Sequence, residues 1–244
     1  MTTELPHHRA LLAAVDWPSL EVPHPTERLD AALLARMTDP DPAERARAAE
    51  AVFSLVDHQE TGYGATPWVA RYVAAALRHP DVLAGPPSCR AGLLRWIART
   101  ADDAEEARTA AAFWGTAEDE EHPPLREFRA LRPELFAAVR PFLTDGHPDV
   151  RAAALFAALP LSEHPELAGH HPELVGHAES FLAASTDRYR RGRVLGALRR
   201  RGRDTAALET AEDRAAREEH LRRLADFRAR GYGVPSLRPV RRRR

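Results

Sequence analysis

Apolar residues recur along most of this chain at the three- to four-residue spacing of a helix, and no stretch alternates long enough to predict a strand. Alanine, a strong helix former, is plentiful. Many of the 20 prolines follow Asp or His between the periodic segments, where the residue before proline is pushed out of the α region. The pattern predicts an all-α protein. Helices are expected at residues 8–15, 26–37, 43–58, 67–78, 88–100, 103–115, 124–142, 148–159, 172–184, 188–201 and 204–230.

One short pattern recurs where helices are expected to begin. In residues 142–160, Asp145 lies in a turn, Pro148 opens the next helix and Arg151 follows in its first turn, six residues after the aspartate. Proline suits the first helical position, and a turn aspartate can cap the helix while meeting the arginine. Two further segments repeat the six-residue spacing. The residues predicted to be structural in these repeats are Asp39, Arg45, Asp102, Arg108, Asp145 and Arg151.

With Asp145 in the turn and Val150 and Arg151 opening the second helix, residues 124–159 resemble a HEAT repeat, a helix pair of about 40 residues. Residues 27–57 resemble one less closely. The resemblance implies a short α-solenoid of about ten helices in antiparallel pairs, whose concave face is lined by second helices and binds other macromolecules. The expected division is a HEAT-like domain at 1–203, a C-terminal helix packing on or extending it at 204–232, and a disordered Arg-rich tail at 233–244.

The formal net charge of −1 conceals two opposite parts. Residues 1–185 hold 16 Arg and 28 acidic residues, whereas residues 186–244 hold 19 Arg and 8 acidic residues. Such asymmetry marks a terminal segment that can bind an acidic partner. Acidic residues in 204–230 can instead neutralise the arginines internally. The candidate polyanion-binding residues, which fall outside the buried stripe of the helix at 188–201, are Arg190, Arg193, Arg200 and Arg201.

Sequence motifs for chemistry are missing. There is no Gly-x-Ser-x-Gly, no His-Glu-x-x-His and no lysine for a phosphate-binding loop. A His-rich stretch contains His164, His170, His171 and His177, but proline and glycine interrupt it, so no fixed helical face presents a metal-binding pair. We therefore expect no catalytic residue, cofactor or metal.

The single cysteine, Cys89, forms no internal disulfide, and the chain has neither a signal-like start nor an apolar stretch long enough to span a membrane. These features predict a cytoplasmic protein.

The sequence thus favours a non-enzymatic scaffold or adaptor of HEAT-repeat type that binds a partner protein. The alternative is a HEAT-like protein that binds nucleic acid through its basic C-terminal segment. A relationship to the HEAT-like DNA glycosylases is a variant of that alternative, although no residue here matches their catalytic aspartate.

Overall fold

The computed structural model describes residues 6–57, 62–114 and 123–229, and its regular elements in these ranges are all helices, without a strand. The all-α prediction is confirmed. The chain forms two compact units, Met1–Phe181 and Leu182–Arg244. The Arg-rich tail expected at 233–244 lies outside the described residues. No helix within the described ranges is long and apolar enough to cross a membrane.

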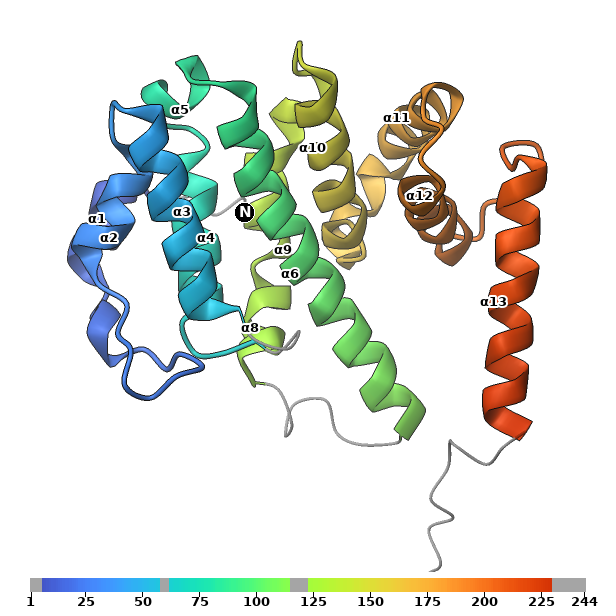
Figure 1. Cartoon of the computed structure of the whole chain (residues 1–244), viewed down its shortest axis with the longest axis horizontal. Coiled ribbons are helices and arrows are strands. Elements are labelled where there is room, and N and C mark those ends of the chain that lie inside the picture. The colour runs from blue at the N-terminus through green and yellow to red at the C-terminus, as the bar shows by residue number, and fades with distance from the viewer. Residues whose placement is uncertain (1–5, 58–61, 115–122, 230–244) are drawn as a thin grey trace, which may run out of the picture. The chain divides into compact units, whose positions relative to one another are not determined.

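The first unit contains most of the helices (Figure 1). They are α1 (His8–Ala14), α2 (Ala31–Ala35), α3 (Pro42–Val56), α4 (Thr66–Ala76), α5 (Pro80–Ala84), α6 (Pro87–Trp114), α8 (Pro123–Ala130), α9 (Arg132–Val139) and α10 (Pro148–Leu161). Short 3-10 turns lie at η1 (Trp17–Ser19), η2 (Arg36–Thr38), η3 (Arg140–Thr144) and η4 (Pro165–His170). Helix α11 (His171–Ala184) leads from this unit into the second.

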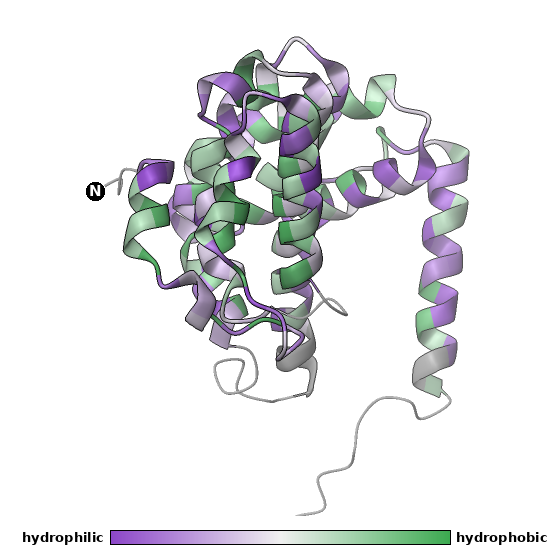
Figure 2. Cartoon of the chain, turned by 60° about the vertical axis from the view of Figure 1, so that its left-hand side comes forward, coloured by the Kyte–Doolittle hydropathy of each residue, from purple (hydrophilic) through white to green (hydrophobic). Residues whose placement is uncertain are grey.

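These helices form two layers. In one layer α1 contacts α4, which contacts α8 and α9; in the other α3 contacts α6, which packs most extensively against α10 (Figure 1). The α6–α10 packing is close because α10 carries a run of buried alanines that let the two backbones approach. Hydrophobic residues concentrate where these helices face one another (Figure 2).

The predicted break between helices at 88–100 and 103–115 is wrong, because α6 runs unbroken from Pro87 to Trp114. Asp102 and Arg108 therefore lie inside a helix and not at a repeat turn. No proline or glycine interrupts α6 there, and Ala101 and Ala104 are fully buried, so packing carries the helix through the acidic stretch. The helix expected at 124–142 is instead α8, α9 and η3 in succession.

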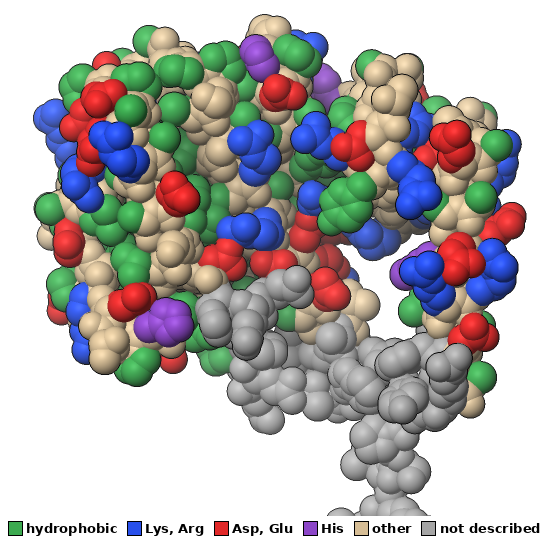
Figure 3. Space-filling model, in the orientation of Figure 1, with side chains coloured by type: hydrophobic (Ala, Val, Ile, Leu, Met, Phe, Trp, Pro, Cys, Tyr) green, Lys and Arg blue, Asp and Glu red, His purple; other side chains and the backbone are tan. Residues whose placement is uncertain are grey.

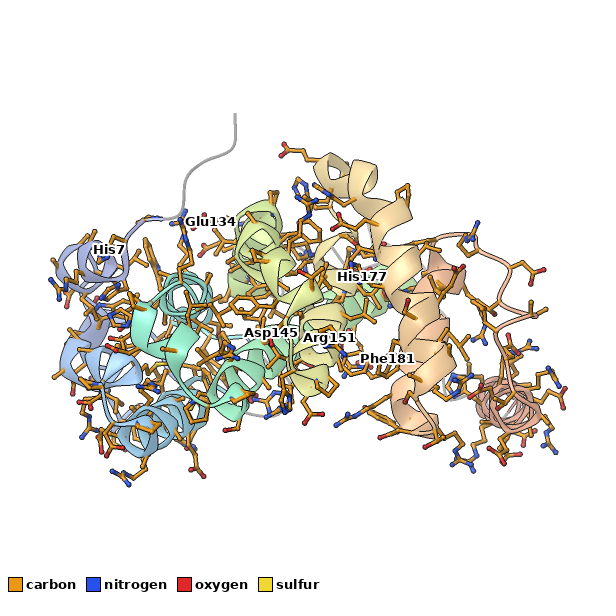
Figure 4. All side chains as sticks on the ribbon, turned by 90° about the horizontal axis from the view of Figure 1, so that it is seen from above. His7, Glu134, Asp145, Arg151, His177 and Phe181 are labelled. Carbon is orange, nitrogen blue, oxygen red and sulfur yellow. The ribbon has the colours of Figure 1, made fainter. Side chains whose placement is uncertain are left out.

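Arg45 and Arg151 share one local geometry, which we call the arginine clamp. Near the start of α3, the Arg45 guanidinium donates to the carbonyls of Asp39 and Pro40, at 2.5 and 3.0 Å. Near the start of α10, Arg151 donates to the carbonyls of Asp145 and Gly146, at 2.8 and 3.0 Å (Figure 4). These carbonyls follow a 3-10 turn that ends the preceding helical segment, where backbone acceptors lack helical partners.

The clamp differs in one respect from the sequence prediction. The aspartate carboxylates accept the backbone N–H two residues later, Asp41 for Asp39 and His147 for Asp145, both at 2.8 Å. The arginine bonds to the aspartate's backbone carbonyl and not to its carboxylate. The six-residue spacing therefore reflects the distance from a helix start to the preceding turn.

Arg90, near the start of α6, forms a third clamp. It is nine-tenths buried and donates to the carbonyls of Leu83 and Gly85, each at 2.8 Å. Its Nε also lies 3.4 Å from the carboxylate of Asp145, in the turn before α10. Arg90 therefore holds its own turn and joins it to the turn of the neighbouring helix.

The second unit contains α12 (Arg188–Arg200) and α13 (Ala211–Ala229), and its clamp residue is Arg191. This buried arginine donates to the carbonyls of Leu182 and Ser185 and pairs with Asp213 at 2.7 Å. The Ser185 hydroxyl accepts from the N–H of Asp187, as the clamp aspartates do two residues along the chain. The turn in the second unit thus has serine where the turns of Arg45 and Arg151 have aspartate.

We predict that Arg90→Met lowers the free energy of unfolding by about 3 kcal/mol, because it leaves turn carbonyls without their donor and removes the ion pair with Asp145. Arg95→Met, on the exposed side of the same helix, is the control and should change it by less than about 0.5 kcal/mol. Urea unfolding followed by circular dichroism measures both. Equal effects of the two variants would contradict the clamp.

A further ion pair, between Glu105 and Arg132, joins α6 to α9. Buried Glu105 accepts from Arg132 at 2.8 Å and also from Arg108 on its own helix. Burial is the largest influence and raises the pKa of Glu105, but the hydrogen bonds from Arg108 and Arg132 together outweigh it and lower that pKa. The ionised carboxylate is therefore more stable in the folded chain than in the unfolded one.

We predict that Glu105→Gln destabilises the protein at neutral pH by roughly 2–4 kcal/mol, since Arg132 stays buried without its counter-charge. A lowered folded-state pKa stabilises above the unfolded value, about 4.3, and this contribution disappears as pH falls through the folded value. The difference between wild type and variant should therefore shrink below about pH 4. A constant difference down to about pH 3 in urea titrations would exclude this linkage.

Candidate functional site

A groove lies between α3 and α6 in the first unit. Its cavity has a volume of about 520 Å³, in the range of ligand and peptide sites. Small residues make both walls, Ala46 and Ala49 on α3 and Cys89 and Gly92 on α6. Unlike α6 and α10, α3 and α6 make few direct backbone approaches, so the space between them stays open.

The floor of the groove is apolar. Phe53 of α3 stacks on Trp96 of α6, with ring centroids 4.9 Å apart and planes 4° from parallel. Leu93, Val82 and Met37 add further apolar surface. In Figure 3, which views this layer from the front, hydrophobic side chains lie recessed between the surfaces of α3 and α6. A partner can therefore bury apolar groups here without first displacing a packed element.

Polar groups mark the two ends and one rim of the groove. Arg45 lines one end, and its buried Nε has no hydrogen-bond partner. Asp57 pairs with Arg99 at the other end. Glu50 is exposed at the rim and makes no ion pair among the described residues. An occupant with a cation near Glu50 would pair with this carboxylate.

Sequence reasoning did not find this groove. It assigned Arg45 a structural role only, and none of the groove's other lining residues forms a motif. The one sequence feature that could indicate a groove is the small residues on the facing sides of α3 and α6. The same residues would also occur in a tightly packed helix–helix interface. Only the separation of α3 from α6 distinguishes the two outcomes.

The predicted polyanion residues lie in the second unit on and just after α12. Arg190, Arg193, Arg200 and Arg201 have the i, i+3, i+10 and i+11 spacing of one helix face. Arg190 and Arg200 are exposed, whereas Arg193 and Arg201 are half-buried. Arg190 also lies 3.4 Å from Asp187, and Arg201 donates to the carbonyl of Ala197 at 2.8 Å. Arg190, Arg193 and Arg200 thus share one side of α12, and Arg201 follows its last residue.

One aromatic residue on this face was missed from the sequence. Tyr189 is 76% exposed and lies four residues before Arg193 and eleven before Arg200, so all three share a helix face. An exposed ring among arginines is the combination that binds single-stranded nucleic acid, by stacking on bases beside phosphate contacts. We call Tyr189, Arg190, Arg193, Arg200 and Arg201 the arginine face.

Acidic residues neutralise other arginines of this unit, as the sequence alternative proposed. Glu209 accepts from Thr205 at 2.6 Å and from Arg199 at 2.9 Å. The hydrogen bond from Thr205 is the largest influence on Glu209, and with Arg199 and Arg217 it lowers the pKa of that carboxyl despite burial. These pairs use Arg199 and Arg217, and Asp213 pairs with Arg191. On the arginine face, Arg190 pairs with Asp187.

The four histidines of the His-rich stretch have separate surroundings. His164 accepts the N–H of Glu166, His171 Nε2 lies 2.9 Å from the carbonyl of Ser162, and His170 packs on Phe136. His177 lies on α11 (Figure 4). No group of three or more His, Cys, Asp or Glu side chains in the described part of the chain is placed to hold a metal ion.

No protein-family model matches this chain, and neither does any curated protein or solved structure. Function is therefore inferred from geometry and charge.

Proposed function

We propose that this chain is a non-enzymatic interaction module, a short HEAT-like helical repeat that binds a partner protein in the α3–α6 groove. The groove carries the proposal, because it is an open, largely apolar site of about 520 Å³ whose rim holds Glu50, a carboxylate with no ion pair among the described residues.

The clamps support the repeat architecture. Arg45 and Arg90 are 45 residues apart, and Arg151 and Arg191 are 40 apart, close to the HEAT period of about 40. The 61 residues from Arg90 to Arg151 contain the long second half of α6. In this reading α3, α6 and α10 are second helices, the ones that line the binding face of such a repeat.

Charge indicates the partner's chemistry. The first unit, residues 1–181, has 28 acidic residues against 16 Arg, and Glu50 lies on the groove's rim. An acidic surface attracts basic partners and raises their association rate. An amphipathic helix fits a groove between two helices, with apolar anchors on the floor. We therefore propose a basic amphipathic helix as the segment bound.

We predict that Ala49→Arg, which fills the groove from its α3 wall, lowers capture of the partner at least about tenfold without unfolding the chain. Ala43→Arg, exposed on α3 and outside the groove, is the matched control and should leave capture intact. The measurement is affinity capture by tagged full-length protein from the cytosol of its source, after nuclease treatment, with quantitative mass spectrometry.

Cys89 gives an independent readout in the same experiment, because it is the chain's single thiol and lines the groove. The bound partner should slow alkylation of Cys89 by a maleimide. Capture that survives Ala49→Arg, or that leaves Cys89 equally reactive, would place the partner elsewhere.

A second candidate function is binding of single-stranded nucleic acid by the arginine face. Two observations favour it: the second unit has 19 Arg against 8 acidic residues, and Tyr189 is 76% exposed among those arginines. Backbone phosphates would contact the arginines while a base stacks on the ring.

For this candidate, Arg193→Gln with Arg200→Gln should reduce the salt dependence of oligothymidylate binding by about one to two phosphate contacts. Tyr189→Ala should cost about 1–3 kcal/mol of binding free energy. Arg188→Gln, on the opposite side of α12 by helical spacing, is the control. Fluorescence anisotropy over a salt series measures all three, and no binding at low salt would exclude the function.

A further inference from the structure

A second cavity lies in the first unit, where the start of α1 meets the turn between α4 and α5. Its volume is about 490 Å³, and its polar lining consists of His7, His8, Arg78 and His79. The rest of the lining is proline and alanine, and no acidic residue contributes to it. Figure 4 marks His7 at the α1 end of this unit. The cavity is separate from the groove and from the arginine face, which share no residue with it.

Two of the three histidines are fixed as hydrogen-bond donors. His7 Nδ1 accepts the N–H of Arg9, and His79 Nδ1 accepts the N–H of Asp81, each at 3.3 Å. An imidazole whose Nδ1 accepts a hydrogen bond carries its proton on Nε2 in the neutral form. Both rings therefore keep an Nε2–H donor in a residue that lines the cavity.

His8 is the buried member of the cluster, with 7% of its surface exposed. Its ring lies edge-on to His79, with centroids 4.8 Å apart, and 4.2 Å from His7. It makes no hydrogen bond through its ring among the described residues. Burial, followed by repulsion from His7, His79 and Arg9, lowers the pKa of His8 to about 4. All these influences on His8 disfavour its protonated, positively charged form, because they come from burial, two other imidazoles and an arginine.

The residues that line the cavity favour a ligand with a negative charge. Arg78 is exposed at the cavity and makes no ion pair in the described part of the chain, and its guanidinium cannot lose its charge near neutral pH. A metal ion would meet this fixed positive charge, and the three imidazoles are not placed to share one. An anion would meet one full charge and at least two N–H donors.

We propose that this cavity is a binding site for a small-molecule oxyanion, such as a phosphate or sulfate ester, held by Arg78 and the Nε2–H groups of His7 and His79. Guanidinium and imidazole donors recognise tetrahedral oxyanions through charge-assisted hydrogen bonds. The cavity exceeds what one inorganic anion fills, so the remaining volume accommodates an organic group.

Binding should strengthen as pH falls toward the pKa of His8, because a bound dianion favours the protonated form of that imidazole. The charged and titratable groups around His8 are His7 and Arg9 on its own element, and Arg78, His79 and Asp81 from the α4–α5 turn. Helix α2, which also packs against α1, has no titratable residue between Ala31 and Ala35. Asp81 lies 3.6 Å from His79 Nδ1 and is the one carboxylate among these groups.

Sulfate is the first probe, because it stays a dianion throughout the pH range in which His8 gains its proton. Calorimetric titration of the full-length chain, at ionic strength matched with chloride, should give tighter binding near the His8 pKa of about 4 than at neutral pH. In proton NMR, sulfate should shift the titration of the His8 ring upward from its ligand-free value. Phenyl phosphate should bind more tightly than inorganic phosphate if an organic group occupies the remaining volume.

Arg78→Gln should weaken sulfate binding at least about tenfold, whereas Arg95→Gln, equally exposed on α6, should leave it unchanged. His79→Asn distinguishes a loss of binding from a loss of stability. Asparagine can still cap α5, but it lacks the Nε2–H donor. This variant should keep the melting temperature and lose affinity. Sulfate binding that Arg78→Gln leaves intact, or an unchanged His8 titration in saturating sulfate, would overturn the proposal.

Discussion

Arginine donation to turn carbonyls is the interaction on which the fold depends. Each clamp places a guanidinium near the start of one helix and directs it back to the end of the preceding segment, where carbonyls lack helical partners. A cation is unfavourable near its own helix's amino terminus but favourable beside the carboxyl end of the helix before it. Arginine can reach back from the start of its own helix to these carbonyls, because its planar guanidinium carries several donors on a long side chain.

The clamps fix where helices start, but side-chain volume decides how closely they then pack. Alanines on α10 let it approach α6 closely, and the Arg90–Asp145 contact joins their turns. Between α3 and α6 similar small residues meet no such close approach, because the stacked Phe53 and Trp96 rings hold the helices apart. The same residue type therefore makes a tight interface in one place and a groove in the other.

The boundary between the acidic and the basic part of the sequence lies close to the boundary between the two structural units. The acidic excess ends with the first unit at Phe181, and the arginine excess belongs to the second unit. Within the second unit Asp213 and Glu209 neutralise the arginines that hold the turns, and Arg190, Arg193 and Arg200 share a separate helix face. The two units therefore carry net charges of opposite sign.

Local sequence determined the helical class, most helix positions and the Asp-to-Arg spacing at Arg45 and Arg151, because periodicity, proline and capping are properties of short segments. It also identified the arginines of α12. The prediction of a helix break near Asp102 was wrong, because buried Ala101 and Ala104 let α6 continue through an acidic stretch. The α3–α6 groove, the exposure of Tyr189 and the meeting of His8 with His79 were decided by tertiary structure alone. The groove and the histidine contact depend on the distance between helices far apart in sequence, and that distance is set by packing volume, which no local pattern records.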